Sequence, residues 1–269
     1  MANDRRITIR MRGRIEDGGD VRFEDFIRQL DSVRTALSET ERITTATKSV
    51  AFRVIGLSHN SPATIVLEAV DGSGNAGVAA DVVGMFMQSI DAVRKGTAPD
   101  RFDYPAFRAF KEISKLVDTH KIEHVGISHN GDTEIPVSAL AKSFDLAFGS
   151  DERETGSVSG MLEQINLHAN QNVFTIYRAS NMPKLRCVFA KDLRQEAIGA
   201  VGKHVTVFGQ LKYKARLDGG RPFEMKVTSI EVHPPDDELP TLMSLFGIAP
   251  DLTGNQSSED YVRRLRDEW

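Results

Sequence analysis

The feature that most constrains the fold is a run of five strand patterns and one helix pattern between residues 157 and 232. Apolar and polar residues alternate, which predicts strands at 157–168, 173–178, 185–189, 204–215 and 223–232. An amphipathic helix over 191–201, ended by Gly202, separates the third strand from the fourth. Gly160 interrupts the first strand, as is typical where a strand bends. The pattern predicts a small domain of five strands and one helix.

This order of strands and helix resembles an OB-fold domain, and the resemblance covers residues 157–232. It implies a five-stranded barrel of the kind that commonly binds oligonucleotides on the face of its second and third strands. Other domains of this fold mediate protein contacts or stabilise a larger assembly.

Strand parity assigns several basic and aromatic side chains to the outer face of this predicted barrel. Single-stranded nucleic acid requires such a mixture, because cations neutralise phosphates and aromatic rings stack on bases. The alternative is a solvated basic face whose aromatic side chains pack under loops or against the other domain. The predicted nucleic-acid-binding residues are Tyr177, Arg178, Arg186, Phe208, Lys212, Lys214 and Arg216.

Charge is unevenly distributed along the 269 residues, although the net charge is only −4. Residues 1–154 hold 20 basic and 24 acidic side chains, residues 155–235 hold 11 and 6, and residues 236–269 hold 3 and 8. Turn-rich polar segments coincide with both breaks. We therefore predict an N-terminal domain over 1–154, the barrel over 155–235, and a linker with a tail helix over 236–269.

The N-terminal region mixes strand and helix patterns, so the predicted fold class of the whole chain is α+β. Asn130-Gly131 lies between two apolar runs, which is a strong hairpin signal because both residues tolerate positive φ. Strands are expected at 6–14, 50–57, 63–70, 122–127 and 133–137, and helices at 23–38, 76–93, 104–117 and 139–148.

A short internal repeat places Gly-Leu-Ser-His-Asn at 56–60 and Gly-Ile-Ser-His-Asn at 126–130. One interpretation is a pair of equivalent loops that present His59 and His129 to a ligand, which would make the chain an enzyme. The other is that two hairpins share turn chemistry. The sequence does not place a nucleophile, a base and an orienting group in a recognisable arrangement, so we assign no catalytic residue.

Two further motifs match known signatures in the wrong context. Gly72–Gly77 fits a dinucleotide-binding glycine loop, yet the strand before it belongs to a hairpin. His120 and His124 fit a zinc-peptidase signature but fall at a helix-to-strand junction, where residues four apart cannot chelate together. We expect no cofactor and no metal. Cys187, the single cysteine, falls in an apolar strand pattern and reads as a core thiol.

The tail pattern predicts a short amphipathic helix with an acidic first turn at Ser257–Asp260. Tyr261, Leu265 and Trp269 form one apolar stripe, which indicates a partner-binding helix or one that docks on its own chain. The run from Leu245 to Trp269 resembles the C-terminal tails of bacterial antitoxins. That resemblance implies a PIN-domain ribonuclease toxin as partner.

Residues 1–14 have no apolar core of signal-peptide length, and the longest apolar stretch is interrupted by Asp81. We expect a cytoplasmic protein with no membrane segment. The leading functional hypothesis is a non-enzymatic binding protein whose OB-like domain holds single-stranded nucleic acid. The alternatives are an antitoxin-like protein that neutralises a toxin through its tail, and an enzyme that uses the His59 and His129 loops.

Overall fold

The computed structural model describes residues 4–45, 48–72, 76–168, 172–178, 184–235, 242–245 and 256–267, and residues 182, 238 and 254. The chain divides into two compact units. The first unit comprises Met1–Thr155 and Gln210–Lys226, and the second comprises Gly156–Gly209 and Val227–Trp269. The segment 210–226 therefore belongs with the N-terminal part of the chain.

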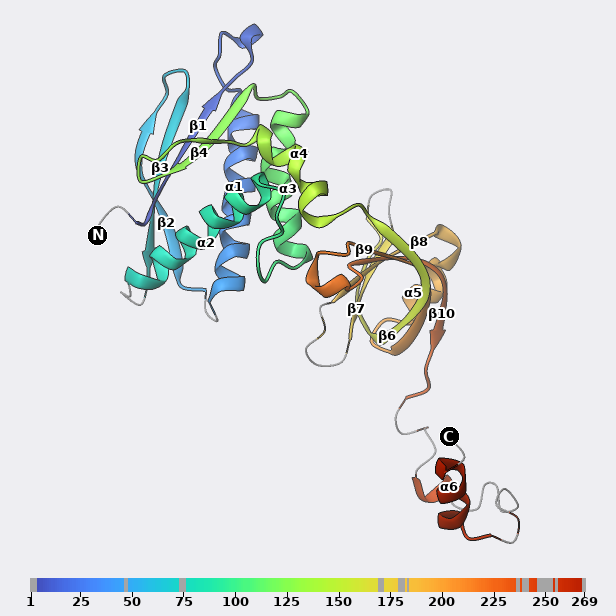
Figure 1. The fold of residues 1–269 in the computed structure, drawn as a ribbon. Coiled ribbons are helices and arrows are strands. Elements are labelled where there is room, and N and C mark those ends of the chain that lie inside the picture. Colours follow the sequence, from blue (N-terminus) through green and yellow to red (C-terminus); the bar gives the residue numbers. More distant parts are fainter. Residues whose placement is uncertain are drawn as a thin grey trace. The chain divides into compact units, whose positions relative to one another are not determined.

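An antiparallel sheet with one buried face forms the frame of the first unit (Figure 1). Its order is β2-β3-β1-β4-β5. Ile7, Ile9 and Met11 of β1 are fully buried, whereas Arg10 and Arg12 are exposed, so alternation along the strand decides which face meets the core. The strands are β1 (Arg6–Arg12), β2 (Val50–Ser58), β3 (Ala63–Asp71), β4 (His124–His129) and β5 (Ile135–Pro136).

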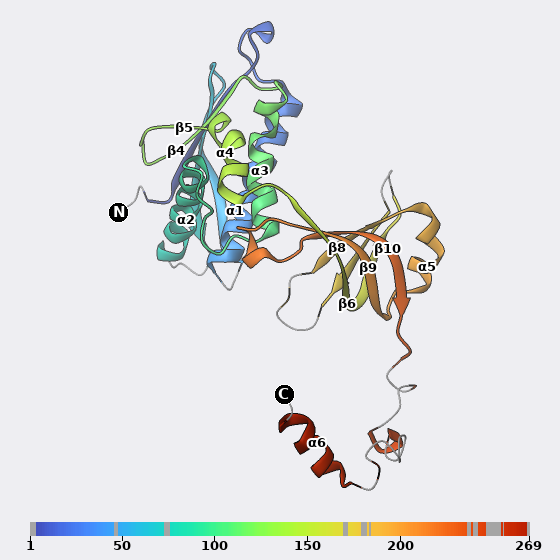
Figure 2. The ribbon, with the colours of Figure 1, turned by 45° about the vertical axis from the view of Figure 1, so that its right-hand side comes forward.

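The helices of this unit lie on the buried face of the sheet (Figures 1 and 2). Asp103 caps the start of α3 by accepting the Ala106 N–H at 3.1 Å, which satisfies one of the unpaired donors of the first turn. Phe86, Phe110, Phe144 and Phe148 of α2, α3 and α4 are fully buried in the core. The elements are η1 (Ile15–Asp17), α1 (Phe23–Thr44), α2 (Ala76–Arg94), α3 (Tyr104–Asp118) and α4 (Ser138–Phe148).

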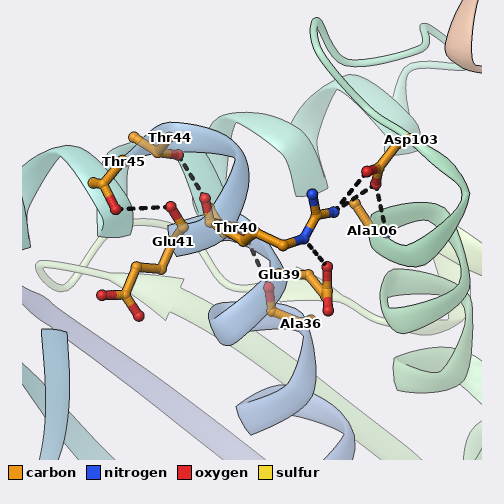
Figure 3. Close-up of polar contacts among 9 residues, drawn as sticks. Ala36, Glu39, Thr40, Glu41, Thr44, Thr45, Asp103 and Ala106 are labelled. Atoms are coloured by element: carbon orange, nitrogen blue, oxygen red, sulfur yellow. Dashed lines mark hydrogen bonds and ion pairs between the residues drawn. The ribbon is translucent and has the colours of Figure 1, made fainter. Parts of the chain in front are cut away.

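Arg42, near the end of α1, joins α1 to the start of α3. Figure 3 shows Glu39 and Asp103, the two carboxylates to which it donates. Its guanidinium donates to both oxygens of Asp103, each at 2.7 Å, and to Glu39 at 2.6 Å. The neighbouring Glu41 is buried and accepts the backbone N–H groups of Ser49 and Val50 at 2.6 and 2.7 Å. These bonds fix both the end of α1 and the start of β2.

The second unit contains the closed barrel, in the order β10-β8-β7-β6-β9. Followed along the chain, the first strand lies between the second and the fourth, and the fifth lies between the third and the fourth. A short helical stretch separates the third strand from the fourth, so this barrel resembles an OB fold. Its elements are β6 (Glu152–Asn166), β7 (Asn172–Tyr177), β8 (Leu185–Phe189), η2 (Lys191–Leu193), α5 (Arg194–Gly199), β9 (His204–Tyr213) and β10 (Glu224–Val232).

The connection between β9 and β10 is built into the core of the first unit. It contains η3 (Asp218–Gly220), and the flanking Leu217 and Phe223 are buried within the same apolar cluster as the sheet and α1 to α4. The three strands β6, β9 and β10 consequently contribute residues to both units.

The predicted α+β class is confirmed, as is a five-stranded barrel with one helix. Asn130 and Gly131 have φ values of 50° and 83°, as the hairpin signal requires. Some boundaries differ from those predicted. The strand β6 begins at Glu152 instead of residue 157, and β4 begins at His124 instead of residue 122, because His120 has a φ of 55° and interrupts the extended chain. The tail holds η5 (Leu242–Leu245) and α6 (Ser258–Asp267).

Gly160 is required by the close approach of β7. A Cβ at this position would lie 2.6 Å from Ile176 Cγ2 and 2.6 Å from the Tyr177 carbonyl oxygen. The pairing of β6 with β7 also shifts between Leu162 and Gln164, where a β-bulge lies. A backbone atom cannot move aside as a flexible side chain can, so β6 tolerates only glycine here.

We expect Gly160→Ala to destabilise the barrel by about 1–3 kcal/mol, because the added methyl group overpacks a closed strand pair. Urea or thermal unfolding followed by circular dichroism measures the effect. The matched control is Gly199→Ala in α5, where a Cβ would meet nothing within 4 Å. That variant should be neutral or slightly stabilising. Equal losses in both variants would contradict this account of Gly160.

Candidate nucleic-acid interface

Tyr177 lies on the outer face of the barrel near the end of β7. Its neighbours Phe174 and Ile176 are fully buried, whereas the Tyr177 side chain is 36% exposed. The register places Met161 of β6 opposite it, and Met161 is 37% exposed. The two side chains therefore form an adjacent, solvent-accessible apolar pair.

Three cationic residues lie near this pair, on the neighbouring strand or next to a strand end. Arg186 of β8 is paired with Thr175, which makes it a diagonal neighbour of Tyr177 on the same face. Arg178 follows Tyr177 directly, and the exposed Lys184 precedes the first residue of β8. We call Met161, Tyr177, Arg178, Lys184 and Arg186 the outer-face patch.

Phe208 is also on the outside of the barrel, with 39% of its side chain exposed, but it lies away from Tyr177. Strand β6 separates β9 from β7. Two contacts set the register of β6 against β9. The Leu162 N–H donates to the Lys203 carbonyl, and the hydroxyl groups of Ser159 and Thr206 are in contact. By that register Phe208 lies about four residues further along the strands than Met161, or about 13 Å.

The remaining predicted residues, Lys212, Lys214 and Arg216, belong to the first unit. Lys212 Nζ lies 2.7 Å from Asp151 Oδ2, and Arg216 donates to the Leu146 carbonyl at 3.3 Å. The seven predicted residues are thus divided between two units, with Tyr177, Arg178, Arg186 and Phe208 in the second.

Lys214 is buried instead of facing outward as strand parity predicts, with only 3% of its side chain exposed. Its ammonium donates to the Gly149 carbonyl at 2.6 Å, and it lies 3.1 Å from Asp151 and 3.4 Å from Asp145. Strand β9 ends at Tyr213, so alternation along the strand no longer determines the direction of this side chain. The charge of Lys214 is already compensated inside the first unit.

The same contacts shift the titration of Asp151. Burial alone would raise the pKa of this carboxyl, but the hydrogen bonds from Lys212 and Lys214 outweigh it and hold the pKa below its usual range. Asp151 therefore stays ionised and keeps both lysines engaged at neutral pH.

The two Ser-His-Asn loops lie at opposite ends of the sheet in the first unit. His129 is paired with Ile7 at the start of β1, whereas Ser58 is paired with Thr64, which in turn pairs with Arg10. β2 and β4 also run in opposite directions. His59 and His129 are therefore not brought together into one site.

In the tail, the residues of α6 that the structure describes are not buried. Leu265 is 42% exposed and Val262 is 51% exposed, while Tyr261 is half-buried and packs against the Arg264 guanidinium at 5.3 Å. Trp269, the third residue of the predicted stripe, lies outside the described residues.

Within the described ranges, no group of three His, Cys, Asp or Glu side chains is placed to hold a metal ion. Cys187 is a buried thiol in β8 that is not part of a disulfide and donates to the Leu185 carbonyl at 3.9 Å. None of the helices in the described part of the chain combines the length and apolar character that crossing a bilayer requires.

Sequence reasoning missed Met161 and Lys184 as members of the outer-face patch. Lys184 directly precedes a predicted strand, so its exposure could have been predicted from the sequence. The position of Met161 opposite Tyr177 depends on the bulge between Leu162 and Gln164, which no local pattern marks.

No protein-family model matches the sequence, and no curated protein matches it. Among solved structures, the chain is similar to part of the S. pombe Stn1–Ten1 complex at 23% identity and a TM-score of 0.24. That similarity covers 30% of this chain and 59% of the S. pombe chain, which is less than two thirds of its length. A second similarity, to OBody AM3L15 bound to hen egg-white lysozyme, has 10% identity, a TM-score of 0.26, and covers 32% of this chain and 82% of that one. The fold class rests on the strand order and the position of the helix.

We expect Lys214→Met to destabilise the first unit by about 1–3 kcal/mol, because it leaves the oxygens around Nζ without their donor. Lys212→Met is the matched control, because Lys212 contacts the same carboxylate from a more exposed position. This substitution should lower the free energy of unfolding by less than Lys214→Met does.

The pKa of Asp151 is lower in the folded than in the unfolded chain. The stability it contributes is therefore present above the usual carboxyl range and is lost as the pH falls through the folded-state pKa.

Unfolding curves at several pH values between about 3 and 7 check this expectation. Lys214→Met should have a weaker loss of stability in acid than the unmodified chain. Identical acid sensitivity in the two proteins would show that the Lys214 contacts do not hold Asp151 ionised.

Proposed function

We propose that the barrel binds single-stranded nucleic acid on its outer-face patch. The observation that carries the proposal is the exposed ring of Tyr177 at the end of the second barrel strand, with Arg186 on the third strand and Arg178 and Lys184 next to the ends of the two strands. The outer face of these two strands is where OB folds commonly bind oligonucleotides.

The chemistry of the patch suits bases without selecting a sequence. A base that stacks on Tyr177 would also contact the apolar Met161, and aromatic stacking contributes about 1–3 kcal/mol per base. Arg178, Lys184 and Arg186 would lie near the backbone phosphates on either side. The proposal excludes Lys212, Lys214 and Arg216, because they belong to the first unit.

Tyr177→Ala in the full chain should weaken binding of an oligonucleotide of about 12 nucleotides roughly tenfold, because the stacking surface is lost. Fluorescence anisotropy at about 50 mM salt measures the affinity. Tyr177→Phe keeps the ring and should bind like the unmodified chain. Arg186→Gln should reduce the slope of log affinity against log salt by about one.

The matched control is Ile198→Ala, which removes an exposed apolar side chain from α5 of the same unit. It should leave affinity unchanged. The proposal is wrong if the unmodified chain shows no saturable binding, or if Tyr177→Ala binds as tightly as Ile198→Ala.

A second candidate function is an antitoxin-like one, in which α6 binds a protein partner. The observation that favours it is the exposure of Val262 and Leu265 on a helix that carries charge on its other faces. Helices of this kind bind by placing one apolar stripe in a groove of the partner. The tail resemblance described above makes a PIN-type ribonuclease the partner to test.

If a PIN-type ribonuclease is encoded beside this chain, Leu265→Asp should weaken its binding at least tenfold, because a carboxylate would enter the apolar groove. Isothermal titration calorimetry with the two purified proteins measures the change. Arg263→Asp adds the same charge to another face of α6 and is the matched control. Equal binding by the two variants, or the lack of such a neighbouring gene, would contradict the antitoxin-like function.

A further inference from the structure

A pocket of about 210 Å³ lies in the first unit, between α3 and the segment 210–226. All of its lining residues belong to this one unit. The residues that define its character are three aromatic and three cationic side chains, Tyr104, Phe107, Phe223, Arg108, Lys111 and Lys212.

Aromatic rings form the walls of the pocket. Tyr104 and Phe223 are stacked with ring centroids 4.1 Å apart and planes inclined by 6°, and Phe107 is buried below them. Lys111 Nζ lies 5.8 Å from the centroid of Phe107, and Lys212 Nζ lies 5.6 Å from that of Phe223. These cation–π contacts hold ammonium groups at the rim while the rings lower the local dielectric constant.

The carboxylates at the pocket are already engaged. Glu112 Oε2 lies 2.9 Å from Lys115 Nζ, and Asp151 contacts Lys212 and Lys214 at 2.7 and 3.1 Å. By contrast, Arg108 and Lys111 have no carboxylate partner among the residues that the structure describes. The pocket therefore has two uncompensated positive charges.

Arg108 and Lys111 are three residues apart on α3, so their side chains lie on one face of the helix within a turn of each other. A guanidinium fork beside an ammonium matches an anion with several oxygens and more than one charge. We infer that this pocket binds the phosphate group of a small phosphorylated ligand, with Arg108 and Lys111 as the charge partners and Lys212 at the edge.

This site is independent of the outer-face patch, because the two lie in different units and share no residue. Loss of the phosphate site leaves the nucleic-acid proposal intact, and the reverse also holds. The variants Lys111→Ala and Tyr177→Ala therefore report on the two proposals separately.

The experiment is an NMR titration of the isotope-labelled full chain with inorganic phosphate, ribose 5-phosphate and acetate in turn. Saturable shifts of the α3 amides by either phosphate compound, with acetate at least tenfold weaker, are the expected result. Tighter binding of ribose 5-phosphate identifies a phosphate ester as the ligand, and equal or tighter binding of inorganic phosphate identifies the free ion. No saturable shifts, or acetate binding as tightly as phosphate, would overturn the inference.

Variants on α3 locate the site. Arg108→Ala and Lys111→Ala should each weaken phosphate binding about tenfold, which is the effect of losing one charged hydrogen bond. Lys142→Ala removes an exposed lysine from α4 of the same unit, outside the pocket lining, and should change the affinity less than twofold. Circular dichroism confirms that each variant is folded. An equal loss in Lys142→Ala would mean that phosphate responds only to the general charge of the unit.

Discussion

The buried ammonium of Lys214 is the constraint on which the organisation of this chain depends. A charged group with 3% exposure is tolerated only when oxygens replace its water, and here Gly149, Asp151 and Asp145 supply them. Withdrawing the segment 210–226 from the first unit would break these contacts and also expose Leu217 and Phe223. The barrel strands β9 and β10 must therefore be interrupted by a segment that folds with the N-terminal part. A single cut near residue 155 would separate residues that fold together.

The elements that could be predicted from the sequence are those that depend only on residues close together in the chain. Positive φ at Asn130 and Gly131 and the alternating burial of β1 were readable because turn chemistry and strand period involve only neighbouring residues. Helix α1 instead continues six residues past the predicted end at Ser38. Its last turns are held by Arg42 bonded to Asp103 and by the buried Glu41 bonded to the start of β2. Such contacts join residues that are distant in the sequence, so a periodicity argument does not contain them.

The candidate site shows the same division between local and long-range information. Tyr177 and Arg186 could be predicted to face outward, because Tyr177 follows a buried residue on its strand and Arg186 lies between two buried residues. Which side chains lie beside them depends on register. A bulge in β6 brings Met161 opposite Tyr177, and the order β7-β6-β9 places Phe208 two strands away. The position of a residue along its strand determines which face of the sheet its side chain is on. Only the pairing between strands determines which side chains lie beside it.

The division into two units changes how the charged residues are counted by region. Residues 155–235 hold 11 basic and 6 acidic side chains, but the segment 210–226 alone accounts for five of the basic and two of the acidic ones. The rest of that region keeps six basic and four acidic side chains, a small surplus. Phosphate contacts at the barrel are consequently few, so stacking on Tyr177 must provide much of any affinity there, and salt should affect it weakly. Two cations of 210–226, Lys212 and Lys214, instead line the pocket beside α3, where Lys212 joins Arg108 and Lys111. Among the residues that the structure describes, the two uncompensated charges of Arg108 and Lys111 therefore lie at a pocket in a unit whose N-terminal sequence is acidic overall, where regional charge counts gave no indication of them.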